Sequence, residues 1–176
     1  LPVGFYGGAT MLYQRTWLLN YDMYKGITTG SSYQNLPVYG SGYGLIAGRN
    51  FSDFRCLQIE FLLKNNYGNK NRIAGDAANS KSSVNLVYSQ INILLKKKYP
   101  CTVLNRYPAS VNLMIGPYYA DLQNQTVSEN AMYRANKTKY SIYDAGVNTG
   151  IEYELGINDN LMLTGGIRTS LGLINI

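Results

Sequence analysis

Apolar and polar residues alternate with a period of two along most of the chain, a pattern typical of β-strands whose two faces meet different surroundings. The clearest stretch is 144–155, where the odd positions are apolar except Thr149 and the even positions are polar or glycine. The same pattern resumes at Leu161, after the turn sequence Gly156-Ile157-Asn158-Asp159-Asn160. The sequence therefore predicts a β-hairpin at the C-terminal end of the chain.

Five earlier segments repeat this alternation, and the first two of them are weaker and richer in glycine. Each predicted strand is long enough to form a tilted membrane strand of about 9–11 residues. The seven predicted strands are 3–13, 39–51, 56–67, 87–99, 111–119, 144–155 and 161–173.

The predicted connections alternate in length. Residues 14–38, 66–83 and 123–139 form long connections, 50–53 and 156–160 short ones, and 100–108 an intermediate one. This alternation is typical of an outer-membrane barrel with short periplasmic turns and long extracellular loops. No repeat or low-complexity tract interrupts the pattern, so residues 1–176 are predicted to form one domain.

Composition leaves two all-β classes open, a soluble sandwich or lipocalin-like domain and a membrane barrel. Only 15% of the residues are charged, against about a quarter in ordinary soluble domains. No apolar run approaches the roughly 18 residues of a membrane helix, but a barrel strand needs apolar residues only at every second position.

Glycine and tyrosine favour the barrel. Several of the 18 glycines fall on the polar faces of the strands, where glycine suits a narrow and strongly curved interior better than a solvated surface. Many of the 17 tyrosines lie near strand ends, as in the aromatic girdles of membrane barrels. The predicted interfacial tyrosines are Tyr13, Tyr39, Tyr67, Tyr99, Tyr119 and Tyr140.

The polar faces carry charged residues that the barrel would place in its lumen. An eight-stranded lumen is filled by side chains, so we expect a salt-bridge plug, with Arg168 paired to Glu152 or Glu154 across the last hairpin. The expected plug residues are Glu60, Lys64, Lys96, Lys98, Glu152, Glu154 and Arg168.

Two cysteines flank the third and fourth predicted strands. Hairpin pairing would bring Cys56 and Cys101 together at the periplasmic rim, where an oxidising envelope permits a disulfide. Strict alternation places them on opposite faces, so the bond requires an irregularity at Pro100. The sequence leaves two alternatives open, a disulfide between Cys56 and Cys101 or two free thiols.

The candidates for chemistry or ligand binding are few. There is no histidine, no metal-ligand cluster and no nucleophile–base constellation, so neither an enzyme nor a cofactor is expected. The run Lys96-Lys97-Lys98 is expected to be a solvated rim cluster, and no nucleic-acid partner is expected. Lipopolysaccharide contact and ordinary solubility are both open for the loop cations Arg15, Lys25, Lys70, Arg72, Lys81, Arg134, Lys137 and Lys139.

Several segments taken together resemble the PorT-like outer-membrane β-barrel family of Bacteroidota, labelled "outer membrane protein beta-barrel domain". The two most specific are YDAGVNTGIEY at 143–153 and GGIRTSLGLINI at 165–176. The others are GFYGG at 4–8, GYGLIAG at 42–48, LQIEFL at 57–62, LLKKKY at 94–99 and LMIGPY at 113–118.

The resemblance implies an antiparallel up-and-down transmembrane β-barrel with an eighth strand ending in an aromatic residue. It also implies a role in secretion or outer-membrane assembly. The chain departs from the family pattern at Asn92, where members usually have proline. Seven strands would leave a sheet edge unpaired in lipid, so we expect the eighth strand to lie outside this sequence or a partner to supply it.

Three functions remain open at this point. The first is a plugged outer-membrane barrel that contacts outer-membrane lipid and serves as a structural or docking subunit of an envelope complex. The second is a porin-like channel or ligand-binding barrel. The third is a soluble lipocalin-like binding domain.

Overall fold

The computed structural model describes residues 4–16, 33–52, 55–73, 81–103, 107–128, 141–158 and 160–173. Within these ranges the chain is all β and forms one sheet. Its strands are β1 (Gly4–Thr16), β2 (Tyr33–Ser52), β3 (Arg55–Ile73), β4 (Lys81–Val103), β5 (Tyr107–Ser128), β6 (Tyr143–Asn158) and β7 (Leu161–Gly172). No helix in the described residues is long and apolar enough to cross a membrane.

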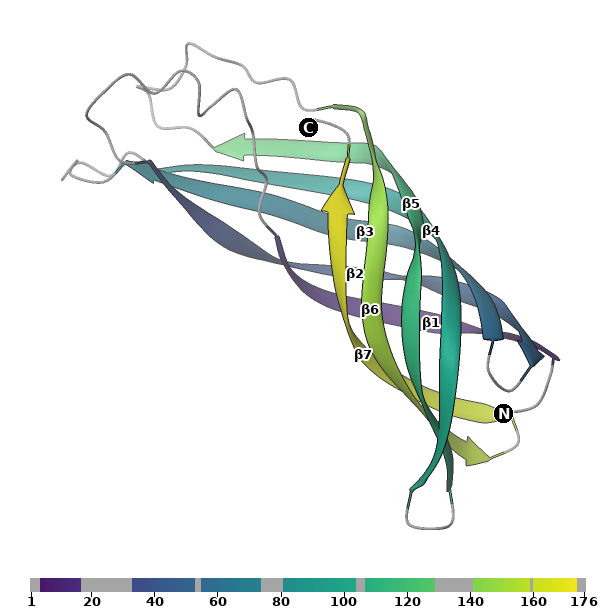
Figure 1. The fold of residues 1–176 in the computed structure, drawn as a ribbon. Helices are drawn as coiled ribbons and strands as arrows, with labels where there is room; N and C mark the ends of the chain where they lie inside the picture. Colours follow the sequence, from purple (N-terminus) through teal and green to yellow (C-terminus); the bar gives the residue numbers. More distant parts are fainter. Residues whose placement is uncertain are drawn as a thin grey trace.

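The sheet is an antiparallel up-and-down meander in which each strand pairs only with its chain neighbours, in the order β1 to β7. Figure 1 shows the strands strongly tilted and the sheet curled around a common interior, as half of a barrel. Because each of the six pairings is antiparallel, β1 and β7 run in the same direction at the two edges.

All seven predicted strands are confirmed, and the connections alternate in length as expected. The strands are separated by residues 17–32, 74–80 and 129–142 at one end of the sheet. At the other end they are separated by residues 53–54, 104–106 and 159–160. We call these the long-loop end and the short-turn end.

Strands β1 to β6 are longer than predicted, and the predicted connection at 100–108 is wrong. β4 has 23 residues and β5 has 22, so Pro100 and Pro108 both lie within strands. β3 pairs with β4 only as far as Lys97, and β6 pairs with β5 only from Ala109. Each proline therefore lies where its strand has a free side, a position in which the missing amide hydrogen is tolerated.

A bulge in β3 changes which residues face inward. The pairing of β3 with β4 shifts between Leu62 and Asn65, and both intervening residues, Leu63 and Lys64, are exposed on the outer face. The alternation beyond the bulge is therefore inverted. Lys64 lies outside although it was predicted in the lumen, and Tyr67 lies inside although it was predicted at the interface.

The two faces of the sheet are the reverse of those in a soluble protein. Large apolar side chains are exposed on the outer face, among them Leu45, Ile59, Ile93, Leu113 and Ile151. The buried inner face is largely polar or charged and includes Gln58, Glu60, Gln90, Asn92, Lys96, Lys98, Asn112, Asn148, Glu152 and Glu154.

Inner glycines make room for tyrosine rings that were not predicted in the interior. A Cβ on Gly48 would lie 2.3 Å from the Tyr6 ring, and one on Gly146 would lie 2.7 Å from the Tyr118 ring. Real Cβ contacts are essentially never this short. The interior can therefore hold these rings only because these positions lack a side chain.

Candidate functional site: the polar interior

The interior is crossed by an ion pair between two strands that are not neighbours in the sheet. Arg168 of β7 donates through Nη1 to Glu60 Oε2 at 2.5 Å and through Nη2 to Glu60 Oε1 at 2.8 Å. The predicted partners of Arg168, Glu152 and Glu154, are therefore wrong. The sheet curls so far that β7 faces β3, and this bidentate ion pair connects the two strands across the interior.

Side-chain amides extend this ion pair into a layer across the interior. Asn92 Nδ2 donates to Glu60 Oε2 at 2.9 Å, and Gln58 Nε2 donates to Glu60 Oε1 at 2.7 Å. Asn92 Oδ1 accepts from Gln90 Nε2 at 2.6 Å and from Asn148 Nδ2 at 2.9 Å. The Glu60 carboxylate thus has four donors, which compensates for its loss of water.

A second charged layer lies nearer the short-turn end. The Lys96 ammonium contacts Glu152 and lies 3.8 Å from Glu154 Oε1, and Lys98 Nζ lies 2.7 Å from Glu154 Oε2. Ser110 Oγ also donates to Glu154 Oε2, at 3.2 Å. The Lys and Glu side chains of this layer are at most 8% exposed, so both basic groups are buried with an acidic partner.

The interior changes character toward the long-loop end. A small apolar cluster there consists of Val84, Leu86, Tyr88, Tyr118 and Ala120, with Tyr67 and Leu122 packed against it. The Tyr118 hydroxyl donates to Asp144 Oδ2 at 2.9 Å. The other carboxylate oxygen, Asp144 Oδ1, is buried and has no hydrogen-bond partner in the described part of the chain.

A cavity of about 1380 Å³ lies on the open side of the sheet, between β1 and β7. Its lining includes Tyr6, Gln58, Glu60, Glu152, Glu154 and Arg168, so it runs alongside both charged layers. Arg168 Nε, whose other nitrogens bind Glu60, has no hydrogen-bond partner among the described residues. The carboxylates and the guanidinium along the cavity are therefore already in ion pairs, Glu60 with Arg168 and the other two glutamates with lysines.

Six of the seven predicted plug residues face the interior and contact one another, and the plug itself stays a prediction. The structure brings Glu60 together with Arg168, and Lys96 and Lys98 together with Glu152 and Glu154. Lys64 is the one predicted plug residue that lies outside, because of the β3 bulge.

Four of the six tyrosines predicted at the interfaces are exposed. Tyr13, Tyr39, Tyr99 and Tyr119 are exposed on the outer face. Tyr67 is instead half-buried inside, where its hydroxyl donates to Gln90 Oε1 at 2.6 Å. Tyr140 lies outside the described residues.

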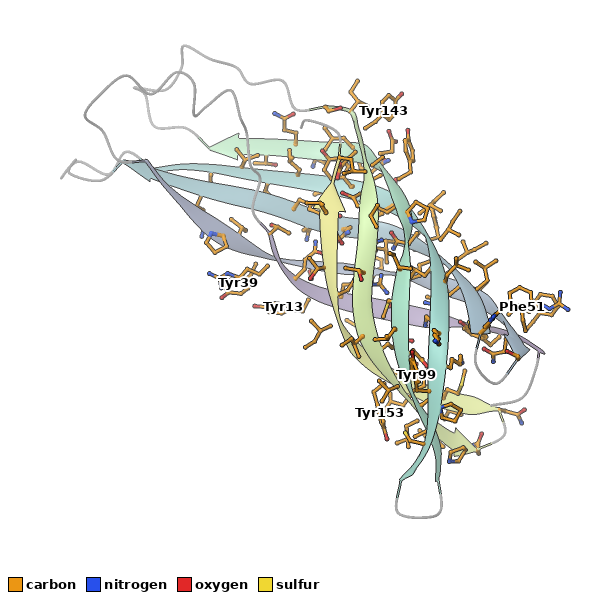
Figure 2. All side chains as sticks on the ribbon, in the orientation of Figure 1. Tyr13, Tyr39, Phe51, Tyr99, Tyr143 and Tyr153 are labelled. Atoms are coloured by element: carbon orange, nitrogen blue, oxygen red, sulfur yellow. The ribbon has the colours of Figure 1, made fainter. Side chains whose placement is uncertain are left out.

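The exposed aromatic rings form two groups. Figure 2 shows Tyr13, Tyr39 and Tyr143 toward the long-loop end, and Phe51, Tyr99 and Tyr153 toward the short-turn end. The Tyr13 and Tyr39 rings stack with centroids 5.8 Å apart, and those of Tyr119 and Tyr143 with centroids 5.9 Å apart.

The candidate disulfide is not formed. Cys56 pairs in register with Lys96, five residues before Cys101, a separation of about 16 Å along the strand. Cys56 is buried beside the Tyr6 hydroxyl at 3.0 Å, whereas Cys101 is exposed, and both are free thiols. A disulfide needs Cα atoms within about 7 Å. The long β4–β5 hairpin, which continues past Pro100, separates the two residues.

Several central interior residues were not predicted as site residues. Asn92 and Asn148 lie on the polar face that the alternation identified, and this inward position was the available signal. Tyr6 and Tyr118 face inward in the same alternation, opposite the glycines described above. Tyrosine was interpreted only as an interfacial residue, which concealed their role as interior hydrogen-bond donors to Gln58 (2.7 Å) and Asp144.

No group of three or more His, Cys, Asp or Glu side chains in the described ranges could hold a metal ion. Comparison with protein-family models, with curated proteins and with solved structures finds no match to this chain.

Proposed function

We propose that the protein is an integral outer-membrane β-barrel protein with a side-chain-filled lumen, which serves as a structural or docking subunit of a larger envelope complex. The observation that carries the membrane assignment is the reversal of the two faces. The inner face buries the ion pairs Arg168–Glu60, Lys96–Glu152 and Lys98–Glu154, while the outer face exposes leucine, isoleucine and phenylalanine. A membrane barrel has this arrangement because its outside meets lipid and its inside is polar.

The distribution of charge along the outer face supports the same assignment. From Leu57 to Leu63 in β3 and from Ile91 to Leu95 in β4, every outward side chain is apolar. The exposed charged residues nearest to these segments, Arg55, Lys64 and Lys97, lie beyond them. A band free of charge and flanked by aromatic rings and cations matches a hydrocarbon layer between two headgroup regions.

The two edges of the sheet support the docking part of the proposal. Within the described residues β1 and β7 each pair on one side only, and lipid offers no hydrogen bonds to the free backbone groups on the other side. One further strand, running antiparallel to both edges, would satisfy them. We propose that such a strand closes the barrel, supplied either by the same protein or by a partner protein.

The resemblance to PorT-like outer-membrane barrels remains a prediction and suggests the setting for this subunit. Under the proposal the protein resides in a bacterial outer membrane, with its long loops extracellular, its short turns periplasmic and a role in secretion or assembly. Its partners would be outer-membrane lipid, lipopolysaccharide and other envelope proteins, with no enzymatic activity of its own.

The cavity between β1 and β7 favours a second candidate, a channel or ligand-binding barrel. The paired charges along its wall could line an aqueous path if the barrel closed without filling it. We give this candidate second place because the charged side chains at the wall bind one another, so a permeating ion would meet groups that are already neutralised.

Two measurements on the purified protein test these proposals. Refolding is expected to require detergent or phospholipid vesicles, and the refolded protein is expected to float with vesicles and resist carbonate extraction. A stable monomer in water without either would overturn the membrane assignment in favour of a soluble binding domain. In planar bilayers we expect no conductance steps, and reproducible unitary steps would replace the plugged barrel with the channel.

A further inference from the structure

We propose that the outer face of β2–β4 at the short-turn end is a binding site for an anionic phospholipid, with Arg55 and Lys97 as its phosphate ligands and Arg49 beside them. This inference rests on the proposed membrane location. It adds a specific lipid class, a specific end of the barrel and the residues responsible.

The site begins with two like charges placed directly opposite each other. Arg55 of β3 and Lys97 of β4 are paired in register, and both are exposed on the outer face. Arg49 of β2 pairs with Leu57, two residues from Arg55, so it is the diagonal neighbour of Arg55 on the same face. Like charges at such positions repel each other, and an anion bound between them removes the repulsion.

No carboxylate of the described chain lies near enough to neutralise this cluster. Of the described acidic residues, Glu60, Asp144, Glu152 and Glu154 face the interior. The remaining one, Asp121, lies eight residues along β5 from Leu113, the register partner of Lys97. At about 3.3 Å per residue this is about 26 Å away. The four ion pairs between described residues all lie inside the barrel.

Aromatic rings hold two of the cations at the rim of the apolar band. The Arg49 guanidinium lies 5.0 Å from the centroid of the Phe5 ring and 5.4 Å from that of Phe51. The Lys97 ammonium lies 5.3 Å from the centroid of the Tyr99 ring. Cation–π contacts fix these side chains at the level of the girdle and leave their hydrogen-bond donors free for an anion.

The surface next to the cations selects a lipid over a free phosphate or an acidic peptide. Two residues along from Lys97 on the same face lies Leu95, which is 60% exposed, followed by Ile93. Leu57 and Ile59 follow Arg55 in the same way on β3. A phospholipid has both the phosphate that matches the cations and the acyl chains that match these apolar rows. Under the proposed orientation this end faces the periplasmic leaflet.

The test uses native mass spectrometry of the full protein in detergent, titrated with phosphatidylglycerol or with phosphatidylcholine of the same acyl chains. We expect phosphatidylglycerol to bind more tightly. The double variant Arg55→Gln, Lys97→Gln should lose about tenfold or more of that preference, since each cation near a lipid surface contributes about fivefold. The matched control is Lys64→Gln, Lys70→Gln, which removes the same charge from exposed lysines toward the long-loop end and should keep the preference.

Four outcomes would overturn the inference, and the first three concern the lipid titration. These three are an absence of preference in the unmodified protein, an equal loss in both double variants, and complete displacement of the lipid by inorganic phosphate. Capture of an acidic protein by the cluster without any lipid preference would also overturn it. If the protein folds into vesicles and shows no preference, this inference alone fails, whereas failure to enter vesicles would remove the proposed function as well.

Discussion

On the inner face of the sheet Arg168, Lys96 and Lys98 each have a carboxylate within hydrogen-bond distance, whereas on the outer face Arg55 and Lys97 face each other with no carboxylate of the described residues beside them. On the outer face of β3 and β4 the segments 57–63 and 91–95 carry no outward charge, and Arg55 and Lys97 lie at the margin of these segments. A buried charge must be paired within the protein. A charge at the margin of an apolar band can be satisfied by water or a headgroup. Under the proposed membrane location, the outer face meets a medium that is apolar in the middle and polar at both margins.

The largest expected effect comes from breaking the inner pairing at one point. Glu60→Ala leaves the Arg168 guanidinium, whose side chain is 16% exposed, without its partner. We expect a loss of about 3–5 kcal/mol in the free energy of unfolding, the typical result of removing one partner of a buried pair. Urea unfolding in vesicles, followed by tyrosine fluorescence, measures this loss.

The control for this change removes both charges. The double variant Glu60→Ala, Arg168→Met should recover much of the lost stability, because no buried charge then lacks a partner. A single variant as stable as the unmodified protein would mean that Arg168 reaches water, and the contrast between the two faces would disappear.

A slightly smaller effect is expected from placing a charge in the middle of the outer face. Ile93→Arg introduces a cation into the apolar band, where it should cost about 2–4 kcal/mol in a bilayer, while Tyr99→Arg near the rim should cost about 0–1 kcal/mol. Both side chains are about equally exposed, at 45% and 44%. In a protein surrounded by water the two substitutions would therefore cost the same, so equal costs in vesicle unfolding would contradict the membrane assignment.

The sequence predicts this contrast between faces well where strict alternation continues. Glu60, Lys96, Lys98, Glu152 and Glu154 all face inward as their even positions indicate. The alternation repeats the same local backbone geometry, so any regular strand obeys it.

The sequence could not predict two other features of the site. The bulge after Leu62 lies in the run Phe61-Leu62-Leu63-Lys64, where nothing in the residue types marks an extra residue, and it reversed both Lys64 and Tyr67. The Arg168–Glu60 pair depends on how far the whole sheet curls. Residues 108 positions apart come together through the sum of many small twists, which no local pattern encodes.

A smaller test concerns the boundary between the charged and apolar parts of the interior. Tyr118→Phe removes the hydroxyl that donates to Asp144 Oδ2 and leaves that carboxylate without any side-chain donor in the described structure. We expect a loss of about 1–3 kcal/mol in the free energy of unfolding, because a buried acceptor then lacks its partner. The double variant Tyr118→Phe, Asp144→Leu should recover part of it, and an unchanged stability in Tyr118→Phe would show that Asp144 is hydrated.

The smallest expected effect is the coupling energy between two stacked tyrosine rings on the outer face. It should be weaker than the ion pairs of the interior. Tyr13 and Tyr39 stack on the outer face with an interplanar angle of 11°, and no buried charge depends on either ring. A double-mutant cycle with Tyr13→Ala and Tyr39→Ala should give a coupling of about 0.5–1.5 kcal/mol in vesicle unfolding, the usual range for an aromatic pair. The matched cycle of Tyr13 with Tyr99, which Figure 2 places at opposite ends of the sheet, should give none. A coupling of Tyr13 with Tyr39 as large as the cost of losing Glu60 would mean that the outer rim, like the interior, is held by specific contacts rather than by the medium around it.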